Sequence, residues 1–268
     1  MASKTPAPVY PGRITTQVAA GIARLVIDNP ARHNAITPDM ARAACDILPA
    51  WAKDPAIRLL VVTGAGEKAF VSGADIESLE AEGGNRAADN SIALMAMFPA
   101  VRDFPKPSIA LIKGYCFGAG VALALSCDLR LASDTAMFSI PSARLGVGYP
   151  ANFTRWLVEV VGVARAKEFL LTARRYTAVE AQAMDLVHKL VALREFDRET
   201  GEYCMHLSQN APLSMQAAKA IVNEVANGIG SADLARCEAL IDACAQSADH
   251  TEGRRAFLEK RSANFVGR

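Results

Sequence analysis

Long hydrophobic runs are missing from this 268-residue sequence, although 51% of its residues are hydrophobic. The longest apolar stretches, such as Val121–Leu125, are far shorter than the roughly 20 residues that span a bilayer. The first eight residues, MASKTPAP, contain neither the apolar segment of an export signal nor the Arg-rich amphipathic pattern of an organelle transit peptide. We therefore expect a soluble protein with no membrane partner and a cytoplasmic location.

An excess of charge of one sign is also missing. The sequence has 29 basic and 28 acidic side chains, so no general electrostatic attraction favours nucleic acid as a partner. Any anionic ligand must instead be bound by a local group of donors. The sequence therefore argues against a nucleic-acid-binding protein.

Cysteine and histidine clusters are missing as well. The six cysteines and four histidines form no C-x-x-C pair and no group at metal-ligand spacing; they are Cys45, Cys116, Cys127, Cys204, Cys237, Cys244, His33, His188, His206 and His250. We interpret the cysteines as small buried hydrophobic residues. The spacing of these residues predicts no disulfide frame and no metal site, and for the protein as a whole we expect no redox cofactor.

Strand and helix patterns alternate through the first half of the chain. Strand-like runs are expected at residues 14–18, 22–27, 58–63, 108–112, 128–132, 137–140 and 186–191. Ala20-Gly21 joins the first two runs as a hairpin, Thr37 and Pro38 begin a helix, and another helix begins near Gly118. Such alternation predicts an α/β architecture with mostly parallel strands.

The second half of the chain has a different pattern. A polar stretch, residues 77–91, predicts a mobile segment before a helix. After residue 152 most of the chain reads as amphipathic helices, among them residues 231–248 and 252–261. We expect a core at residues 1–205, preceded by a short flexible tail, and a helical C-terminal region at residues 206–268.

Two glycine-alanine turns each follow a buried strand. The first contains Gly73-Ala74 and the second contains Gly118-Ala119-Gly120, which leads directly into an apolar helix. The first N–H groups of a helix have no intrahelical partner and carry partial positive charge. Two such turns that face one another can bind an oxyanion. The alternative is that these glycines only provide turn geometry or close helix packing.

A dinucleotide site is a competing interpretation. Residues 64–69, GAGEKA, match the G-x-G-x-x-G/A fingerprint after a strand. That fingerprint opens a helix and is followed about 20 residues later by an acidic residue at a strand end. Gly73 interrupts such a helix, and Glu80 and Glu82 lie in the polar stretch. A nicotinamide-dependent oxidoreductase is therefore the weaker alternative.

Four segments carry a more specific resemblance. Residues 29–36, 63–76, 113–128 and 257–265 resemble, in order, the signatures of the crotonase (enoyl-CoA hydratase/isomerase) superfamily. The resemblance implies a crotonase-like spiral of ββα units with a helical C-terminal trimerisation region. It also implies an acyl-CoA substrate, in which coenzyme A is part of the substrate, and self-association as a homotrimer or a dimer of trimers.

The resemblance also implies roles for particular residues. The backbone N–H groups of Ala74 and Ala119 match the donors that bind the thioester oxygen. The positions that line the coenzyme A channel are Arg32, Ala35, Ser72, Ala74 and Ile76. Lys260 matches a lysine that reaches a coenzyme A phosphate, often from a neighbouring subunit. The alternative for Lys260 is a solvated charge at the end of a helix.

The sequence departs from the family's hydratases at two positions. Ala122 and Ser142 stand where those enzymes have glutamates. Hydration needs one proton taken from water and one delivered to carbon, and a positioned acid or base contributes roughly 10²–10⁴ in rate. Alanine does neither, and serine without an adjacent base is too weakly acidic. We therefore expect slow hydration and retain Ser142 as a candidate catalytic position.

Decarboxylation of a malonyl-type thioester needs no protein base, because the departing CO₂ leaves the enolate electrons behind. Residues 104–107, 145–150 and 259–267 resemble methylmalonyl-CoA decarboxylases of the family, which carry a histidine where this chain has Ala74. Tyr149 matches an active-site tyrosine that orients the leaving carboxylate or a trapped water; simple packing is the alternative. We favour a lyase that decarboxylates its substrate. The alternatives are an enoyl-CoA hydratase/isomerase with a relocated acid and base, and a non-catalytic acyl-CoA-binding pseudoenzyme.

Overall fold

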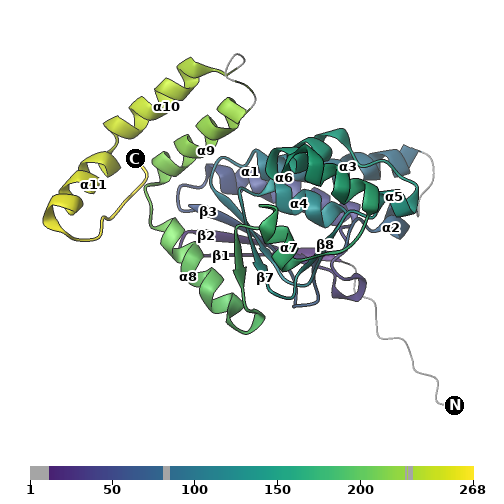
Figure 1. The fold of residues 1–268 in the computed structure, drawn as a ribbon. Coiled ribbons are helices and arrows are strands. Elements are labelled where there is room, and N and C mark those ends of the chain that lie inside the picture. The colour runs from purple at the N-terminus through teal and green to yellow at the C-terminus, as the bar shows by residue number, and fades with distance from the viewer. Residues whose placement is uncertain (1–11, 81–84, 227, 229–231) are drawn as a thin grey trace.

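Two β-sheets form the centre of the protein, and helices cover them (Figure 1). The computed structural model describes residues 12–80, 85–226, 228 and 232–268, so the tail expected at the N-terminus and Glu82 lie outside the described residues. The first sheet has the order β1 (Arg13–Ala19), β2 (Ile22–Asp28), β3 (Leu59–Gly64), β5 (Ser108–Ile112), β7 (Leu129–Ser133) and β10 (Lys189–Val191). The second has the order β4 (Ala69–Val71), β6 (Tyr115–Phe117), β8 (Met137–Ser139) and β9 (Tyr176–Thr177).

The predicted α/β architecture is confirmed. β1 and β2 form an antiparallel hairpin in which Ala19 pairs with Ile22, and β2, β3, β5, β7 and β10 then pair in parallel. The helices are α1 (Pro38–Lys53), α2 (Ile76–Glu80), α3 (Asn85–Arg102), α4 (Ala119–Ser126), α5 (Ser142–Leu145), α6 (Ala151–Thr172), α7 (Ala178–Ala183), α8 (Phe196–Ser208), α9 (Pro212–Ala226), α10 (Leu234–Gln246) and α11 (Ala248–Glu259). Thr37 caps α1 as predicted, since its Oγ1 accepts a hydrogen bond from Met40 N at 3.2 Å.

The structure differs from the sequence prediction in two regions. Strands β4, β6 and β9 have only two or three residues each, which is too short for the alternation of a strand to be recognised. Helices α2 and α3 occupy the described parts of residues 77–91, where a mobile segment was predicted. Asp75 explains the start of α2, because its carboxylate accepts a hydrogen bond from Ser78 N at 3.3 Å.

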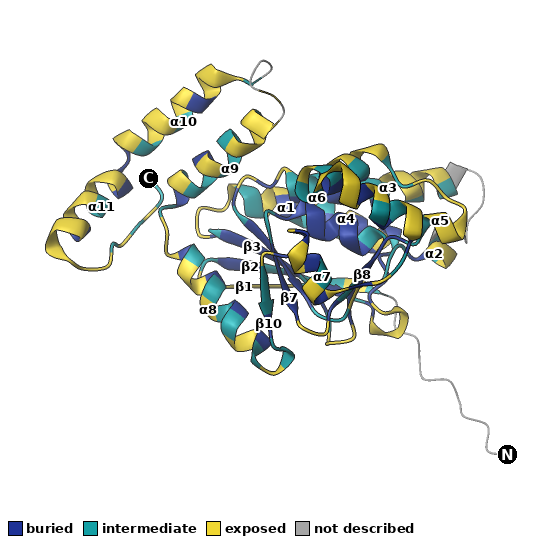
Figure 2. Ribbon diagram, viewed as in Figure 1, coloured by how far each residue is buried: buried dark blue, intermediate teal, exposed yellow. Residues whose placement is uncertain are grey.

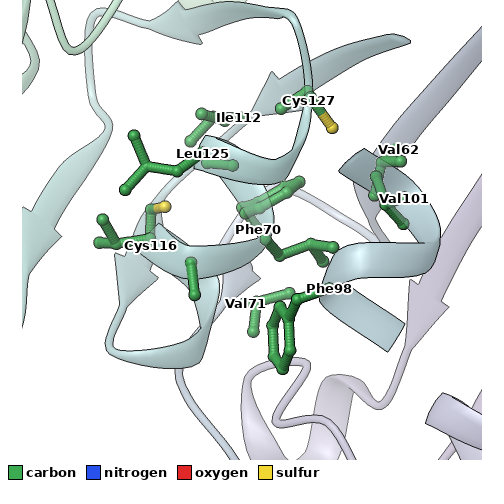
Figure 3. Close-up of a cluster of buried hydrophobic side chains, with 14 of the residues drawn as sticks. Val62, Phe70, Val71, Phe98, Val101, Ile112, Cys116, Leu125 and Cys127 are labelled. Carbon is green, nitrogen blue, oxygen red and sulfur yellow. The ribbon is translucent and has the colours of Figure 1, made fainter. Parts of the chain in front are cut away.

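The main core lies between the sheets and α1, α3, α4 and α6. Figure 3 shows Phe70 and Val71 of β4 packed against Phe98 of α3, with Cys116 of β6 and Leu125 of α4 close by. Each of these five side chains is at most 2% exposed. The short second sheet is therefore held in place by the same core that packs the helices.

Tyr176 of β9 is a buried side chain whose hydroxyl group has no hydrogen-bond partner among the described residues. Its ring stacks on Phe169 at 4.3 Å and lies under the Arg174 guanidinium at 3.7 Å. Phenylalanine keeps these ring contacts and removes the unpaired group, so Tyr176→Phe should raise the free energy of unfolding by about 1 kcal/mol.

Thermal unfolding of the Tyr176→Phe variant measures this effect. We expect a rise in the midpoint of about 2–4 °C. Tyr115→Phe is the matched control, because Tyr115 is 36% exposed and water can hydrogen-bond its hydroxyl. A lower midpoint for Tyr176→Phe would show that this hydroxyl makes a stabilising contact.

The C-terminal helices α9, α10 and α11 extend away from the sheets (Figure 1). Much of their surface is exposed (Figure 2). Phe257 and Leu258 of α11 are 82% and 78% exposed, and Ile241 of α10 is 54% exposed. Large apolar side chains at such exposure leave this part of one chain with an uncovered apolar surface.

Candidate active site

The two glycine-alanine turns lie side by side. β4 and β6 pair in parallel, with Ala69 opposite Tyr115 and Val71 opposite Cys116, so the residues that follow each strand meet at the same edge of the second sheet. A Cβ atom on Gly118 would lie 4.0 Å from the Cα of Gly73. The two turns, which are distant in sequence, therefore lie next to each other, while the convergence of their N–H groups on one oxygen stays a prediction.

The backbone N–H groups of Ala74 and Ala119 donate no hydrogen bond within the part of the chain that the structure describes. Their neighbours are paired: Gly73 O accepts from Ile36 N at 3.0 Å, and Gly118 N donates to Ser139 O at 2.8 Å. Both alanines are half-buried, and Ala119 is the first residue of α4. Two unpaired donors on adjacent turns are available to an acceptor outside the described chain.

Close packing of α4 against β4 sets the separation of the two turns. A Cβ atom on Gly120 would lie 2.2 Å from the carbonyl oxygen of Val71, a distance that no side chain tolerates. Gly118 has φ 51° and ψ −107°, which glycine adopts without strain. Gly118 and Gly120 therefore provide the turn geometry and close helix packing predicted from the sequence as their alternative role. The same close approach also brings the Ala74 and Ala119 N–H groups near each other.

Asn34 is a functional candidate that the sequence interpretation missed. Its Nδ2 donates to Ala65 O at 2.9 Å and to Ala69 O at 2.7 Å, while its Oδ1 accepts from Asn29 N at 3.0 Å. Asn34 is 1% exposed and has φ 59°, a left-handed conformation that asparagine tolerates. It fixes the loop at residues 29–36 to the connection between β3 and β4. In the sequence, only the position of this polar residue within the family-like segment at residues 29–36 could have indicated its role.

The predicted channel residues gather around this loop. Ser72 Oγ donates to Arg32 O at 3.0 Å, and the Arg32 guanidinium forms ion pairs with Glu77 at 2.5 Å and Asp75 at 3.6 Å. The hydrogen bond that the Arg32 guanidinium donates to the Glu77 carboxylate raises the pKa of Arg32. Ala35 lies in the loop at residues 29–36 and is buried, whereas Ile76 is the first residue of α2 and is 55% exposed.

Lys260 lies apart from the other predicted site residues within one chain. It follows the last residue of α11 in a left-handed conformation, and α11 lies at the far end of the C-terminal helices from α2 (Figure 1). A contact between Lys260 and a ligand at the two turns therefore requires a second copy of the chain. That role stays a prediction.

Positions 122 and 142, where the family's hydratases have glutamates, lie in helices α4 and α5. Ala122 is fully buried in α4, and Ser142 is the half-buried first residue of α5. The two acids that immediately follow Ala74 in sequence, Asp75 and Glu77, both pair with Arg32. These two carboxylates therefore hold the loop at residues 29–36 through Arg32.

Tyr149 lies between α5 and α6 and reaches the second turn. Its hydroxyl donates a hydrogen bond to Gly118 O at 3.2 Å, and its ring packs against Phe153 at 5.8 Å. Burial raises the pKa of the Tyr149 phenol, so this side chain remains protonated and acts as a hydrogen-bond donor. The predicted contact with a leaving carboxylate stays a prediction.

The dinucleotide interpretation is wrong. Gly64 ends β3, and residues 65–68 form a turn that leads into strand β4 rather than into a helix. The fingerprint needs a helix N-terminus for the pyrophosphate. The described residues also contain no group of three side chains able to hold a metal ion, and none of their helices is long and apolar enough to cross a membrane.

The two sheets, the covering helices and the paired turns define an α/β enzyme of the crotonase fold. Residues 17–268 match the family model for enoyl-CoA hydratase/isomerase. The chain belongs to this family, the crotonase superfamily, whose members act on acyl-CoA thioesters. The fold predicted from the resemblance is thereby confirmed.

Several relatives are similar over nearly the whole chain. A crotonyl-CoA hydratase of Syntrophomonas wolfei subsp. wolfei is 34% identical over 248 residues, which are 92% of this chain and 95% of the relative. The crystal structure of an enoyl-CoA hydratase from Bacillus anthracis superposes with a TM-score of 0.90 at 26% identity, covering 96% of this chain and all of the other. An enoyl-CoA hydratase from Polaromonas sp. JS666 gives a TM-score of 0.86 at 28% identity, covering 95% and 100%.

These names do not support the decarboxylase resemblance. The three relatives above are named hydratases, and none of them is named a methylmalonyl-CoA decarboxylase. The preference for decarboxylation therefore rests on the sequence alone, namely on the residues at positions 122 and 142 and on the segments that resemble the decarboxylases.

Proposed function

We propose that the protein binds an acyl-CoA thioester with its carbonyl oxygen between the N–H groups of Ala74 and Ala119, and that these donors stabilise the enolate. The observation that carries the proposal is the pair of unpaired amides on adjacent turns. A preorganised donor acts where charge develops in the transition state, so it needs no titrating side chain. Arg32, Ala35, Ser72 and Ile76 form the adjoining wall for the coenzyme A moiety.

An enoyl-CoA is the substrate class that the relatives favour. A 2-enoyl thioester becomes an enolate when a nucleophile adds to its β-carbon, and an isomerisation passes through a similar dienolate. The hydratase names of the relatives support this assignment. Because Ala122 and Ser142 carry no carboxylate, the acid and base of such a reaction must come from other groups, such as bound water.

Decarboxylation of a malonyl-type thioester is the second candidate. The absence of carboxylates at positions 122 and 142 favours it, because cleavage of the bond to CO₂ generates the enolate without a base. The carboxylate carbon leaves as CO₂, its bonding electrons enter the enolate, and water supplies the proton that the α-carbon then takes up.

One experiment distinguishes the two reactions. The purified protein is incubated separately with crotonyl-CoA and methylmalonyl-CoA, and the thioesters are followed by mass spectrometry. Gain of water by crotonyl-CoA supports hydration, and loss of CO₂ from methylmalonyl-CoA supports decarboxylation. Binding of both thioesters in calorimetry without either product would identify a non-catalytic acyl-CoA-binding protein and overturn both reactions.

We also propose that the chain functions as a homotrimer or a dimer of trimers, with residues 206–268 as its helical association region. The exposed Phe257 and Leu258 of α11 support this proposal, as does the distance of Lys260 from the site in one chain. Sedimentation analysis of the full chain tests it. A monomer at micromolar concentration would contradict both self-association and a coenzyme A contact from Lys260.

A further inference from the structure

The peptide between Gly118 and Ala119 carries two groups of interest. Its N–H, from Ala119, is one of the two unpaired donors, while its C=O, from Gly118, accepts hydrogen bonds from Tyr149 Oη and from Ala122 N, both at 3.2 Å. The N–H and the C=O of a trans peptide lie in one plane and point in opposite directions. Any group that fixes the carbonyl therefore also fixes the direction of the N–H.

The backbone restrains this peptide through one helical hydrogen bond, from Ala122 N to Gly118 O at 3.2 Å. Gly118 is the N-cap of α4, and no side chain caps this helix end. With φ 51° and ψ −107°, Gly118 occupies a region that glycine leaves easily, since it lacks a Cβ. Rotation of the peptide about its flanking bonds would turn the Ala119 N–H away from the Ala74 N–H. The hydroxyl of Tyr149 opposes that rotation together with the Ala122 N–H, and it is the side-chain group that does so.

A hydrogen bond to a carbonyl also strengthens the N–H donor of the same peptide. Chains of hydrogen bonds polarise one another, and the effect is larger where water is excluded. Tyr149 is placed for this effect, because its ring is held against Phe153 of α6 and packs against the main core. The chain of donors runs from the Tyr149 hydroxyl through the Gly118–Ala119 peptide to the bound oxygen.

We propose that Tyr149 is a positioning residue that orients and polarises the Gly118–Ala119 peptide and so acts on the thioester through a backbone donor rather than by contact with substrate. This inference rests on the proposed oxyanion site. It assigns Tyr149 a role common to every reaction that the site can catalyse, because each passes through the same oxyanion.

The test uses the full-length protein and the isosteric variant Tyr149→Phe. The infrared stretch of a ¹³C-labelled crotonyl-CoA thioester carbonyl reports its polarisation when bound. We expect a smaller downward shift in the variant than in the wild type, with an unchanged dissociation constant for coenzyme A. The kcat for the reaction that the protein catalyses should fall about tenfold at unchanged KM.

A second variant should increase the downward shift of the carbonyl stretch instead of reducing it. Incorporation of 3-fluorotyrosine at position 149 gives a stronger hydrogen-bond donor, so the carbonyl shift should increase. Tyr115→Phe, in which the altered residue lies outside the proposed donor chain, should leave the shift unchanged. A purely structural role of Tyr149 predicts no such graded response.

Each failure has a distinct meaning. Equal carbonyl shifts in wild type, Tyr149→Phe and the fluorotyrosine protein would overturn the positioning role and leave the oxyanion site intact. A parallel loss of thioester affinity in Tyr149→Phe would also overturn it, since that result indicates direct contact with substrate. No carbonyl shift in the wild type would overturn the proposed function itself.

Discussion

Replacing Ala119 with proline should lower kcat by about 10²–10³, because the variant lacks one of the two oxyanion donors. A backbone donor cannot be removed by changing an ordinary side chain, but proline has no N–H. Ala119 is the first residue of α4, and the first helical position accepts proline well. The change therefore removes the donor and leaves the helix in place.

The reaction found with crotonyl-CoA or methylmalonyl-CoA provides the measurement. Ala119→Gly is the control, because it changes the side chain at the same position but keeps the N–H, and we expect its kcat to stay within a few-fold of the wild type. Far-ultraviolet circular dichroism of both variants checks that the fold is retained. A folded Ala119→Pro protein with wild-type kcat would refute the assignment of this donor.

Replacing Gly120 with alanine should cause a large loss of stability. The new Cβ would lie 2.2 Å from Val71 O and 3.1 Å from Val71 Cβ, and a backbone oxygen in a strand cannot rotate away as a side chain does. Helix α4 and strand β4 must then separate. We expect the free energy of unfolding to fall by about 3 kcal/mol, at the upper end of typical overpacking costs.

Denaturant unfolding followed by fluorescence measures this loss. Gly201→Ala is the matched control in helix α8, since no atom beyond the adjoining backbone of its own helix lies within 4 Å of its added Cβ. There alanine replaces glycine in a helix interior, so stability should rise by about 0.5–1 kcal/mol. A Gly120→Ala protein as stable as the wild type would show that α4 and β4 do not pack as closely as described.

The two variants also separate stability from catalysis. Ala119→Pro removes a donor while the packing of α4 remains, whereas Gly120→Ala displaces both turns through the helix that follows one of them. Activity lost in the first variant with an unchanged unfolding midpoint identifies the N–H itself as the source of rate enhancement.

Much of the fold could be predicted because its signals are local. Buried β-branched runs such as residues 58–63 and 108–112 coincide with β3 and β5, and Thr37 followed by Pro38 coincides with the start of α1. The second sheet could not be predicted in this way. β4 and β6 have three residues each, and a segment of that length stays extended only because the core and its neighbours hold it.

The site was predicted in part and for a similar reason. Glycine-alanine turns after buried strands, together with the family resemblance, identified Ala74 and Ala119 as candidates. The partners of Tyr149 and Asn34 were not visible in the sequence, because both side chains bind backbone atoms of distant segments. Pairing across 31 residues, as between Tyr149 and Gly118, has no local pattern.

The sequence by itself determined the family, the α/β class and the absence of carboxylates at positions 122 and 142, since residue identity and short-range periodicity are sufficient for each of these. Only the tertiary structure decided that the two turns meet, that Arg32 pairs with Glu77 and Asp75, and that the Tyr149 hydroxyl bonds to Gly118 O. The meeting of the two turns depends on the parallel pairing of β4 and β6, which brings distant backbone groups to one edge of the sheet. Such contacts follow from positions in space and not from order along the chain.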